Sequence, residues 1–261
     1  MPANTRLLTI ALAGLSGLSA SLHGQTLLTQ AGSEYTQNFD TLSNTAGSTT
    51  NVLSLSGWFM TETGGGARDN EQYAVDTGAS STGDTYSYGA AAATDRAFGS
   101  LRSGTLISSF GAAFTNGTGA TLTGLVIAYD GEQWRLGTAA RTDRLDFQYS
   151  TDATSLTTGT WTDVDALDFI TPNTATTGAK DGNAAANRVS LTSPITGLAI
   201  ADGATFWIRW NDIDASGADD GLAVDNFSLT PSAIPEPASF ASLVGLLGLG
   251  VALARRRAAR G

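Results

Sequence analysis

The chain contains no cysteine, and its only histidine is His23, near the N-terminus. The absence of cysteine excludes disulfides, cysteine nucleophiles and thiolate zinc sites. Because no histidine follows position 23, Ser-His-Asp relays and imidazole metal sites are excluded from the body of the chain. Chemistry in the body must therefore use carboxylates, hydroxyls, the single lysine Lys180 or an oxygen-bound metal.

Basic residues are also few, since 14 lysines and arginines stand against 24 aspartates and glutamates in the 261 residues. Without Arg6 and the four arginines after Ala254, nine basic residues remain; without Glu236, 23 acidic residues remain, so residues 25–233 carry a net charge of −14. Such an acidic body predicts no nucleic-acid partner and poor binding to anionic membrane surfaces.

Long apolar runs occur only at the two ends of the chain. The C-terminal run, residues 238–254, has 17 residues and no charge, and it lies between Pro235-Glu236-Pro237 and Arg255-Arg256-Arg257. As a helix it would reach roughly 25 Å, close to the hydrocarbon thickness of a bilayer. We therefore predict a transmembrane helix, with cytoplasmic arginines after it and an extended, protease-accessible segment at the prolines.

The order of these three parts resembles the PEP-CTERM sorting signal of Gram-negative bacteria, over about the last 28 residues. The resemblance implies that an exosortase-type membrane protease removes the tail near Pro235, Glu236 and Pro237, and that the body is released or attached at the cell surface. It also implies an association with exopolysaccharide and biofilm. The alternative is a plain membrane anchor that stays in place; both interpretations put the body outside the cytoplasm.

The N-terminal run has the layout of a secretory signal peptide. Arg6 precedes the apolar residues 7–15, and small residues follow as far as Gly24, so cleavage is expected after Ala20 or Gly24. A retained N-terminal anchor is the alternative. The predicted organisation is a signal peptide over 1–24, a β-sandwich domain over 25–230, a linker over 231–237, a transmembrane helix over 238–254 and a basic tail over 255–261.

The composition of the body favours an all-β fold. Aspartate outnumbers glutamate 19 to 5, and glycine, serine, threonine and asparagine are abundant, which favours strands joined by polar loops. A body of this length is normal for one all-β domain. We expect an antiparallel two-sheet sandwich of the jelly-roll kind, without internal repeats.

Alternating apolar residues mark the individual strands. The clearest cases are residues 145–149, residues 125–129 followed by a turn at Asp130-Gly131, residues 206–210, and residues 222–229 with a bulge near Asn226. Further strand candidates are residues 35–41, 51–60, 71–76, 96–102, 106–114, 160–170 and 188–192. Loops are expected at residues 44–50, 64–68 and 178–186.

The densest group of acidic residues follows the 206–210 strand. The metal-site candidates are Asp212, Asp214, Asp219, Asp220 and Asp225. Mutual repulsion among these carboxylates would be relieved by calcium, which takes six to eight oxygen ligands. The spacing begins like an EF-hand loop but places Ala223 where the bidentate ligand belongs, so it is not an EF-hand. Residues 219–227 resemble the last strand of extracellular modules of the MAM and carbohydrate-binding type. The alternative is a solvated loop whose aspartates cap turns.

A second candidate site lies in residues 129–135. Trp134 offers an aromatic face for a sugar ring, and Glu132 and Arg135 offer hydrogen-bonding groups for its hydroxyls. The alternative is that Trp134 packs in the core or across a sheet while Glu132 and Arg135 form a surface pair.

No catalytic motif stands out, so the sequence predicts a non-catalytic protein of the cell surface or matrix. Two further classes remain open: a carbohydrate-binding module, with calcium as a candidate cofactor, and a glycoside hydrolase, for which two carboxylates suffice.

Overall fold

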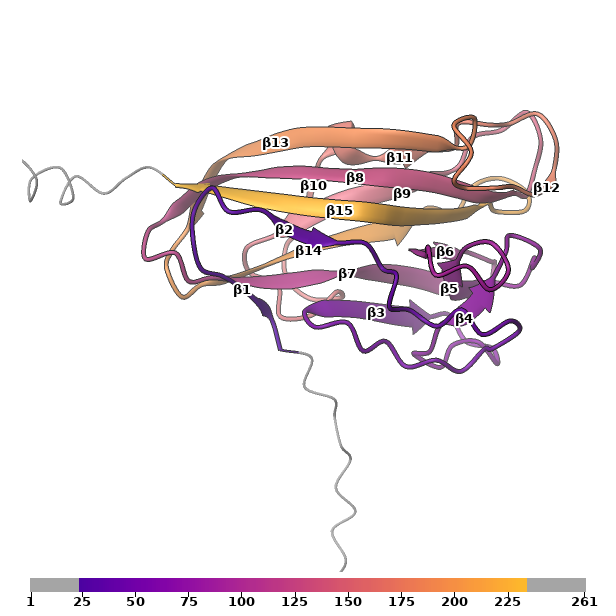
Figure 1. The fold of residues 1–261 in the computed structure, drawn as a ribbon, viewed down its shortest axis with the longest axis horizontal. Coiled ribbons are helices and arrows are strands. Elements are labelled where there is room, and N and C mark those ends of the chain that lie inside the picture. Colours follow the sequence, from indigo (N-terminus) through magenta and orange to yellow (C-terminus); the bar gives the residue numbers. More distant parts are fainter. Residues whose placement is uncertain (1–23, 234–261) are drawn as a thin grey trace, which may run out of the picture.

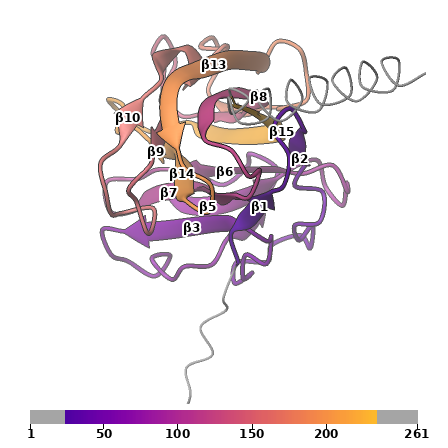
Figure 2. The same ribbon diagram turned by 90° about the vertical axis from the view of Figure 1, so that its left-hand side faces the viewer.

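Two facing β-sheets make up the computed structural model, which describes residues 24–233 (Figure 1). The seven-stranded sheet A contains β1 (Thr26–Leu28), β3 (Trp58–Thr63), β7 (Ile107–Asn116), β9 (Arg144–Ser150), β10 (Thr162–Asp163), β11 (Phe169–Ile170) and β14 (Thr205–Asp212). The eight-stranded sheet B contains β2 (Tyr35–Gln37), β4 (Ala74–Asp76), β5 (Asp84–Tyr88), β6 (Ala97–Leu101), β8 (Leu122–Leu136), β12 (Gly178–Ala179), β13 (Arg188–Ile200) and β15 (Gly221–Ala233). Figure 2 shows the two layers end-on.

The core lies between the sheets, as the alternating pattern predicts. On β14, Phe206, Ile208 and Trp210 point inward and are fully buried. Trp210 stacks on Trp58 of β3, with ring centroids 6.1 Å apart and planes 10° apart. Buried aromatic area of this kind supplies most of the stabilisation of such a sandwich. The two-sheet β-sandwich is therefore confirmed, although β1 with β7 and β4 with β5 pair in parallel.

The bulge expected near Asn226 is present on β15. Asn226 has a φ of 49°, and the pairing register with β8 shifts between Asp225 and Ser228. Because the bulge adds one residue, Val224 before it and Phe227 after it both face the core. Asp225 is left on the opposite, outer face of sheet B.

The turn predicted at Asp130-Gly131 is wrong, because β8 runs without interruption through both residues. Gly131 serves packing instead: a Cβ there would lie 2.2 Å from Cδ2 of Phe169 in sheet A. The missing side chain lets the Phe169 ring sit directly on the β8 backbone.

Other strand limits also differ from expectation. The 160–170 candidate consists of β10, a 3₁₀ turn (Asp165–Leu167) and β11. The 188–192 candidate extends to Ile200 through Pro194, which an edge strand tolerates. Only residues from Trp58 onward of the 51–60 candidate form a strand. The sequence did not predict β1, β5 or β12, and β12 forms the first two residues of the loop expected at residues 178–186.

The predicted sorting motif, transmembrane helix and basic tail lie outside the described residues, as does nearly all of the predicted signal peptide. Within residues 24–233 no helix is long and apolar enough to cross a membrane. β15 continues to Ala233, so residues 231–233, expected as linker, belong to the final strand.

Candidate functional site

A hollow lies at the end of the sandwich where β14 finishes and β9 begins. Its volume is about 400 Å³, and we call it the end hollow. Its lining residues are Arg141, Thr142, Asp143, Arg144, Ile170, Ile213, Ala215 and Ser216. Ile170 is 52% exposed, so the hollow combines open apolar surface with cationic and hydroxyl groups.

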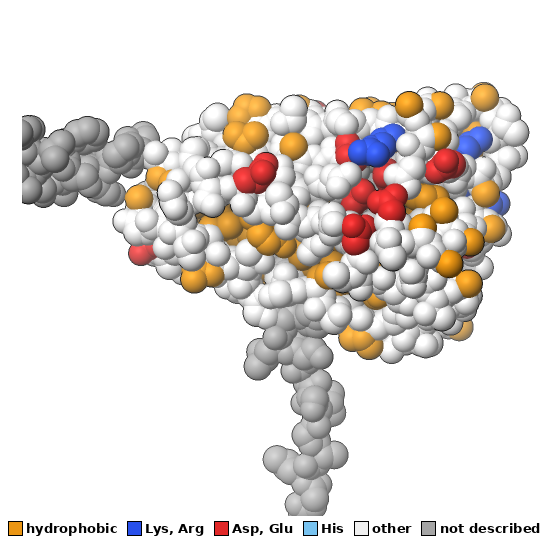
Figure 3. Space-filling view, in the orientation of Figure 1, with side chains coloured by type: hydrophobic (Ala, Val, Ile, Leu, Met, Phe, Trp, Pro, Cys, Tyr) orange, Lys and Arg blue, Asp and Glu red, His pale blue; other side chains and the backbone are white. Residues whose placement is uncertain are grey.

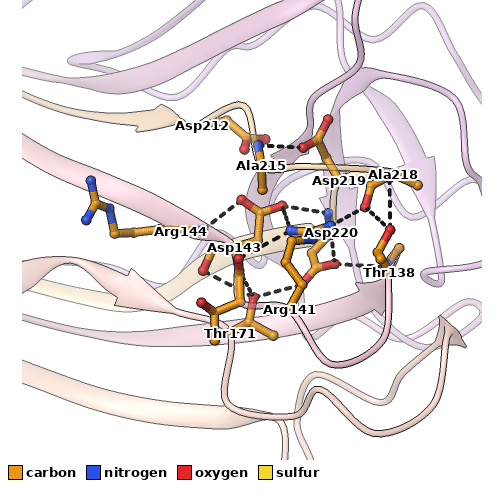
Figure 4. Close-up of polar contacts among 12 residues, drawn as sticks. Thr138, Arg141, Asp143, Arg144, Thr171, Asp212, Ala215, Ala218, Asp219 and Asp220 are labelled. Atoms are coloured by element: carbon orange, nitrogen blue, oxygen red, sulfur yellow. Dashed lines mark hydrogen bonds and ion pairs between the residues drawn. The ribbon is translucent and has the colours of Figure 1, made fainter.

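Asp143 anchors the floor of the end hollow (Figure 4). Its buried carboxylate accepts hydrogen bonds from the backbone N–H of Arg144 at 2.8 Å and of Asp220 at 2.8 Å. The Arg141 guanidinium lies 3.1 Å from the same carboxylate. A buried charge with this many partners is held in one orientation.

Asp220 ties the neighbouring loops together beneath the hollow (Figure 4). It is fully buried and accepts hydrogen bonds from the backbone N–H of Gly137 at 2.7 Å and from the Thr171 hydroxyl at 2.7 Å. Arg141 lies 3.4 Å from it. Burial raises the pKa of Asp220, while the bonds from Gly137 and Thr171 oppose the rise. Asp220 therefore has a structural role at the base of the site.

Asp212 and Asp219 lie beside this pair. One oxygen of Asp212 accepts a hydrogen bond from Ser100 at 2.7 Å, and the other, Oδ1, is buried and has no partner among the described residues. Burial, followed by the charge of Asp143, raises the pKa of Asp212 well above its usual range. Burial also raises the pKa of Asp219 to about 6, and its carboxylate accepts the backbone N–H of Ala215 at 3.0 Å.

The five aspartates predicted as calcium ligands do not converge. Asp214 is 66% exposed and lies 3.8 Å from Arg102, whereas Asp225 lies opposite Asp130 on the outer face of sheet B. Strand geometry explains the separation: β14 and β15 belong to different sheets, and the four steps from Gly221 to Asp225 cover about 13 Å.

Within residues 24–233 no three His, Cys, Asp or Glu side chains are arranged to hold a metal ion. The set of five therefore does not fit a single ion. Calcium binding near Asp212 and Asp219, where one buried carboxylate oxygen has no partner, stays a prediction.

The predicted sugar-binding group forms no open platform from Trp134, Glu132 and Arg135. Trp134 is 2% exposed and stacks on Tyr88, with ring centroids 6.1 Å apart. The backbone at Gly182 covers its indole, since a Cβ there would lie 2.3 Å from Nε1. Arg135 donates to the carbonyl oxygens of Gly78 and Ala79, both at 3.2 Å. The packing alternative describes Trp134 in this structure, but its surface pair is wrong, because Glu132 is buried and accepts a hydrogen bond from Trp134 while Arg135 donates to backbone carbonyls.

Glu132 instead lies near enough to Asp225 for its charge to add to the rise that burial causes in the pKa of that carboxyl. The Trp134 N–H donates to one Glu132 oxygen at 3.0 Å, while Glu132 Oε1 and Asp225 Oδ1 are buried without a partner among the described residues. Burial raises the pKa of Glu132 to about 7. Figure 3 shows acidic side chains gathered beside basic ones over the part of the face that β8, β13 and β15 occupy in Figure 1.

Aromatic residues on the outer face of sheet A form a group that was not predicted from the sequence. Trp207 and Arg209 face outward from β14 and alternate along it with the core residues Phe206, Ile208 and Trp210. A large aromatic side chain at an outward position was the available signal, since polar residues are expected there.

No protein-family model matches the chain, and no curated protein matches it. Among solved structures, the K3 cleaved adhesin domain of Lys-gingipain from Porphyromonas gingivalis W83 is similar at 10% identity, over 76% of this chain and 99% of that chain, with a TM-score of 0.43. The K2 cleaved adhesin domain of Lys-gingipain gives 12% identity over 76% of this chain and 99% of that chain, with a TM-score of 0.41. TmCBM61 in complex with β-1,4-galactotriose gives 9% identity over 54% of this chain and 74% of that chain, with a TM-score of 0.30. At these identities and TM-scores the similarities carry no argument about function.

Proposed function

We propose that this protein is an exported, non-catalytic binding module that takes a saccharide into the end hollow. The observation that carries the proposal is the composition of the hollow: Ile170 and Ile213 offer apolar surface beside the Arg144 guanidinium and the Ser216 hydroxyl. A concave site with apolar walls and a few polar groups is the usual form of a small-molecule site, and its volume of about 400 Å³ falls within the usual range.

The exposed groups suit a polyhydroxylated ligand. The Arg144 side chain is 46% exposed, and its Nε contacts Asp146 and lies 3.8 Å from Asp168, so the rest of the guanidinium is available as a donor. The isoleucine side chains can pack against the C–H groups of a sugar ring, and Ser216 can exchange hydrogen bonds with its hydroxyls. The body carries a strong negative charge, which favours a neutral saccharide over an anionic one.

Binding is favoured over hydrolysis because the hollow lacks a suitable pair of carboxylates. Glycoside hydrolysis needs two carboxyl groups that flank the scissile bond. Among the lining residues only Asp143 has a carboxylate, and that group is engaged with Arg141 and two backbone N–H groups.

Export and sorting are supported by the two ends of the sequence, which resemble a signal peptide and a PEP-CTERM tail. The proposed partner is an exosortase-type membrane protease, and the proposed destination is the cell surface or the extracellular matrix. β15 starts beside the end hollow and finishes at Ala233 after 13 residues, a length of about 43 Å. A body held through its C-terminus would therefore present the hollow away from the attachment point.

Affinity electrophoresis of the purified protein in gels containing neutral polysaccharides tests this function. Ser216 is exposed, so Ser216→Trp should fill the hollow without disturbing the core. Thr192→Trp, at an exposed position on β13, is the matched control. We expect one polysaccharide to retard the wild type and the control but not Ser216→Trp. Equal retardation of all three proteins, or no retardation by any polysaccharide, would contradict the proposal.

A further inference from the structure

The outer face of sheet A carries a second hollow, of about 200 Å³. Its lining residues are Phe59, Met60, Thr61, Ser155, Leu156, Thr157 and Trp207. The rings of Phe59 on β3 and Trp207 on β14 lie 4.8 Å apart between centroids, with planes 43° apart. We call this hollow, together with the neighbouring side chains of β9 and β14, the aromatic face.

Small residues on β7 create the space for the aromatic face. Phe59 pairs with Gly111, which in turn pairs with Arg209, so a glycine separates the two large side chains across three strands. Trp207 pairs in the same way with Ala113. At Gly111 and Ala113, β7 therefore presents no side chain larger than a methyl group between β3 and β14.

A row of polar side chains lies beside the aromatic rings. Arg209 Nε donates to Gln148 Oε1 at 2.7 Å, and Gln148 Nε2 donates to Asp163 at 2.5 Å. The Asn211 side-chain amide lies within hydrogen-bond distance of Gln148, at 2.8 Å, and of Ser109, at 2.5 Å. These contacts hold the amide and guanidinium groups in place before any ligand arrives.

Two aromatic groups complete the face. The Arg209 guanidinium carbon lies 3.9 Å from the centroid of the half-buried Trp161 ring, which holds this ring beside the polar row. Trp207 is only 4% exposed, and its indole N–H has no hydrogen-bond partner among the described residues. A buried donor without a partner is costly, and a ligand hydroxyl would satisfy it.

We propose that the aromatic face is a second saccharide-binding site, which takes a neutral hexopyranose unit of a polysaccharide. The C–H side of the sugar ring packs on Phe59 and Trp161, and its hydroxyls bond to Gln148 and Asn211. This inference rests on the proposed saccharide-binding function but uses different residues. The end hollow and the aromatic face share no lining residue, so a single polysaccharide chain that reaches both would bind with increased avidity.

Affinity electrophoresis and titration with a β-1,4-galactan, a β-1,3-glucan, a mannan and a dextran test the proposal. Gln148→Ala and Trp161→Ala alter half-buried residues of the face, and Trp207→Phe keeps a ring while it removes the N–H donor. We expect each variant to weaken binding by about tenfold or more while circular dichroism shows a folded protein. Thr192→Trp is again the control.

The outcomes separate this proposal from the proposed function. If Ser216→Trp abolishes binding and the three face variants bind as the wild type does, the aromatic face is not a saccharide site and the end hollow is. If only the face variants lose binding, the face stands and the end hollow fails. A dimer in light scattering that Trp161→Ala dissociates, together with unchanged saccharide binding, would identify the face as a protein interface and overturn the proposal.

Discussion

Asp225 on β15 lies directly opposite Asp130 on β8, yet the pKa values of the two carboxyls move in opposite directions. Burial raises the pKa of Asp225 to about 8, and the charge of Glu132 adds to the rise. Burial acts in the same direction on Asp130, but hydrogen bonds from Ser190, Arg188 and Asn226 outweigh it and lower its pKa. One pair of facing aspartates thus holds a charged carboxylate beside one that is largely protonated at neutral pH.

This arrangement predicts that the protein becomes less stable as the pH rises. The carboxyls of Asp225 and Glu132 have folded-state pKa values of about 8 and about 7, against about 4 in an unfolded chain. Their contribution is fully present below pH 4 and is lost as the pH rises through the folded-state values. Thermal unfolding followed by circular dichroism from pH 5 to 9 should show a falling Tm.

The matched variant Asp225→Asn should flatten this pH dependence, because it removes one titrating group while it keeps the shape of the side chain. We expect the loss of unfolding free energy between pH 5 and 9 to shrink by about 4 kcal/mol, since a pKa of about 8 in the folded state gives about three pH units of loss above pH 5. Asp214→Asn, at an exposed position, should leave the profile unchanged. A wild-type Tm that rises over the same range would contradict the assignment.

Arg141 should prove essential to the loops beneath the end hollow. Its guanidinium lies within 3.4 Å of two fully buried carboxylates, those of Asp143 and Asp220. Arg141→Ala would leave both charges buried without their cation, at a cost of about 3 to 5 kcal/mol. Urea unfolding should report this loss, while Arg144→Ala, at a side chain that is 46% exposed, should cost less than about 1 kcal/mol. Similar effects of the two substitutions would refute the structural role of Arg141.

We expect calcium binding to depend on Asp212. Its Oδ1 atom is the buried carboxylate oxygen near Asp219 that has no partner among the described residues. Calcium at about a hundred times its dissociation constant would stabilise the fold by about 2.7 kcal/mol. We expect calcium to raise the Tm of the wild type and not that of Asp212→Asn. No change in Tm between excess chelator and millimolar calcium would remove the calcium prediction.

The sorting prediction concerns the C-terminal residues. Pro235→Ala combined with Pro237→Ala would allow the helix to extend through the segment that a protease must grip. We expect the wild type to lose the residues after the motif and to appear at the surface or in the medium, and the double variant to stay in the membrane at full length. Mass spectrometry of each cell fraction measures this directly. Unprocessed wild-type protein in the cytosol would refute export.

The strands could be predicted where alternation was strong, and the reason is local. Phe206, Ile208 and Trp210 must share one face of any strand, and the core between the sheets receives them. The change of face near Asn226 was also visible in the sequence, because Val224 and Phe227 are apolar at odd spacing.

The failures arose where a residue's role depends on a distant partner. Gly131 was predicted as part of a turn, but its role is to leave room for the Phe169 ring, which packs on it from sheet A. The aspartates looked like one site because they are close in the sequence, whereas Asp212 and Asp225 belong to different sheets. Trp207 was assigned to a strand but not to a face with Phe59, since nothing local indicates that β3 and β14 flank β7.

Hydrogen exchange of the full protein, with and without a retained polysaccharide, tests the binding account most directly. The account predicts slower exchange in the segments 141–144 and 213–216 that line the end hollow, and unchanged exchange along β13. Unchanged exchange in both hollow segments while the polysaccharide is bound would contradict the claim that the ligand enters this hollow.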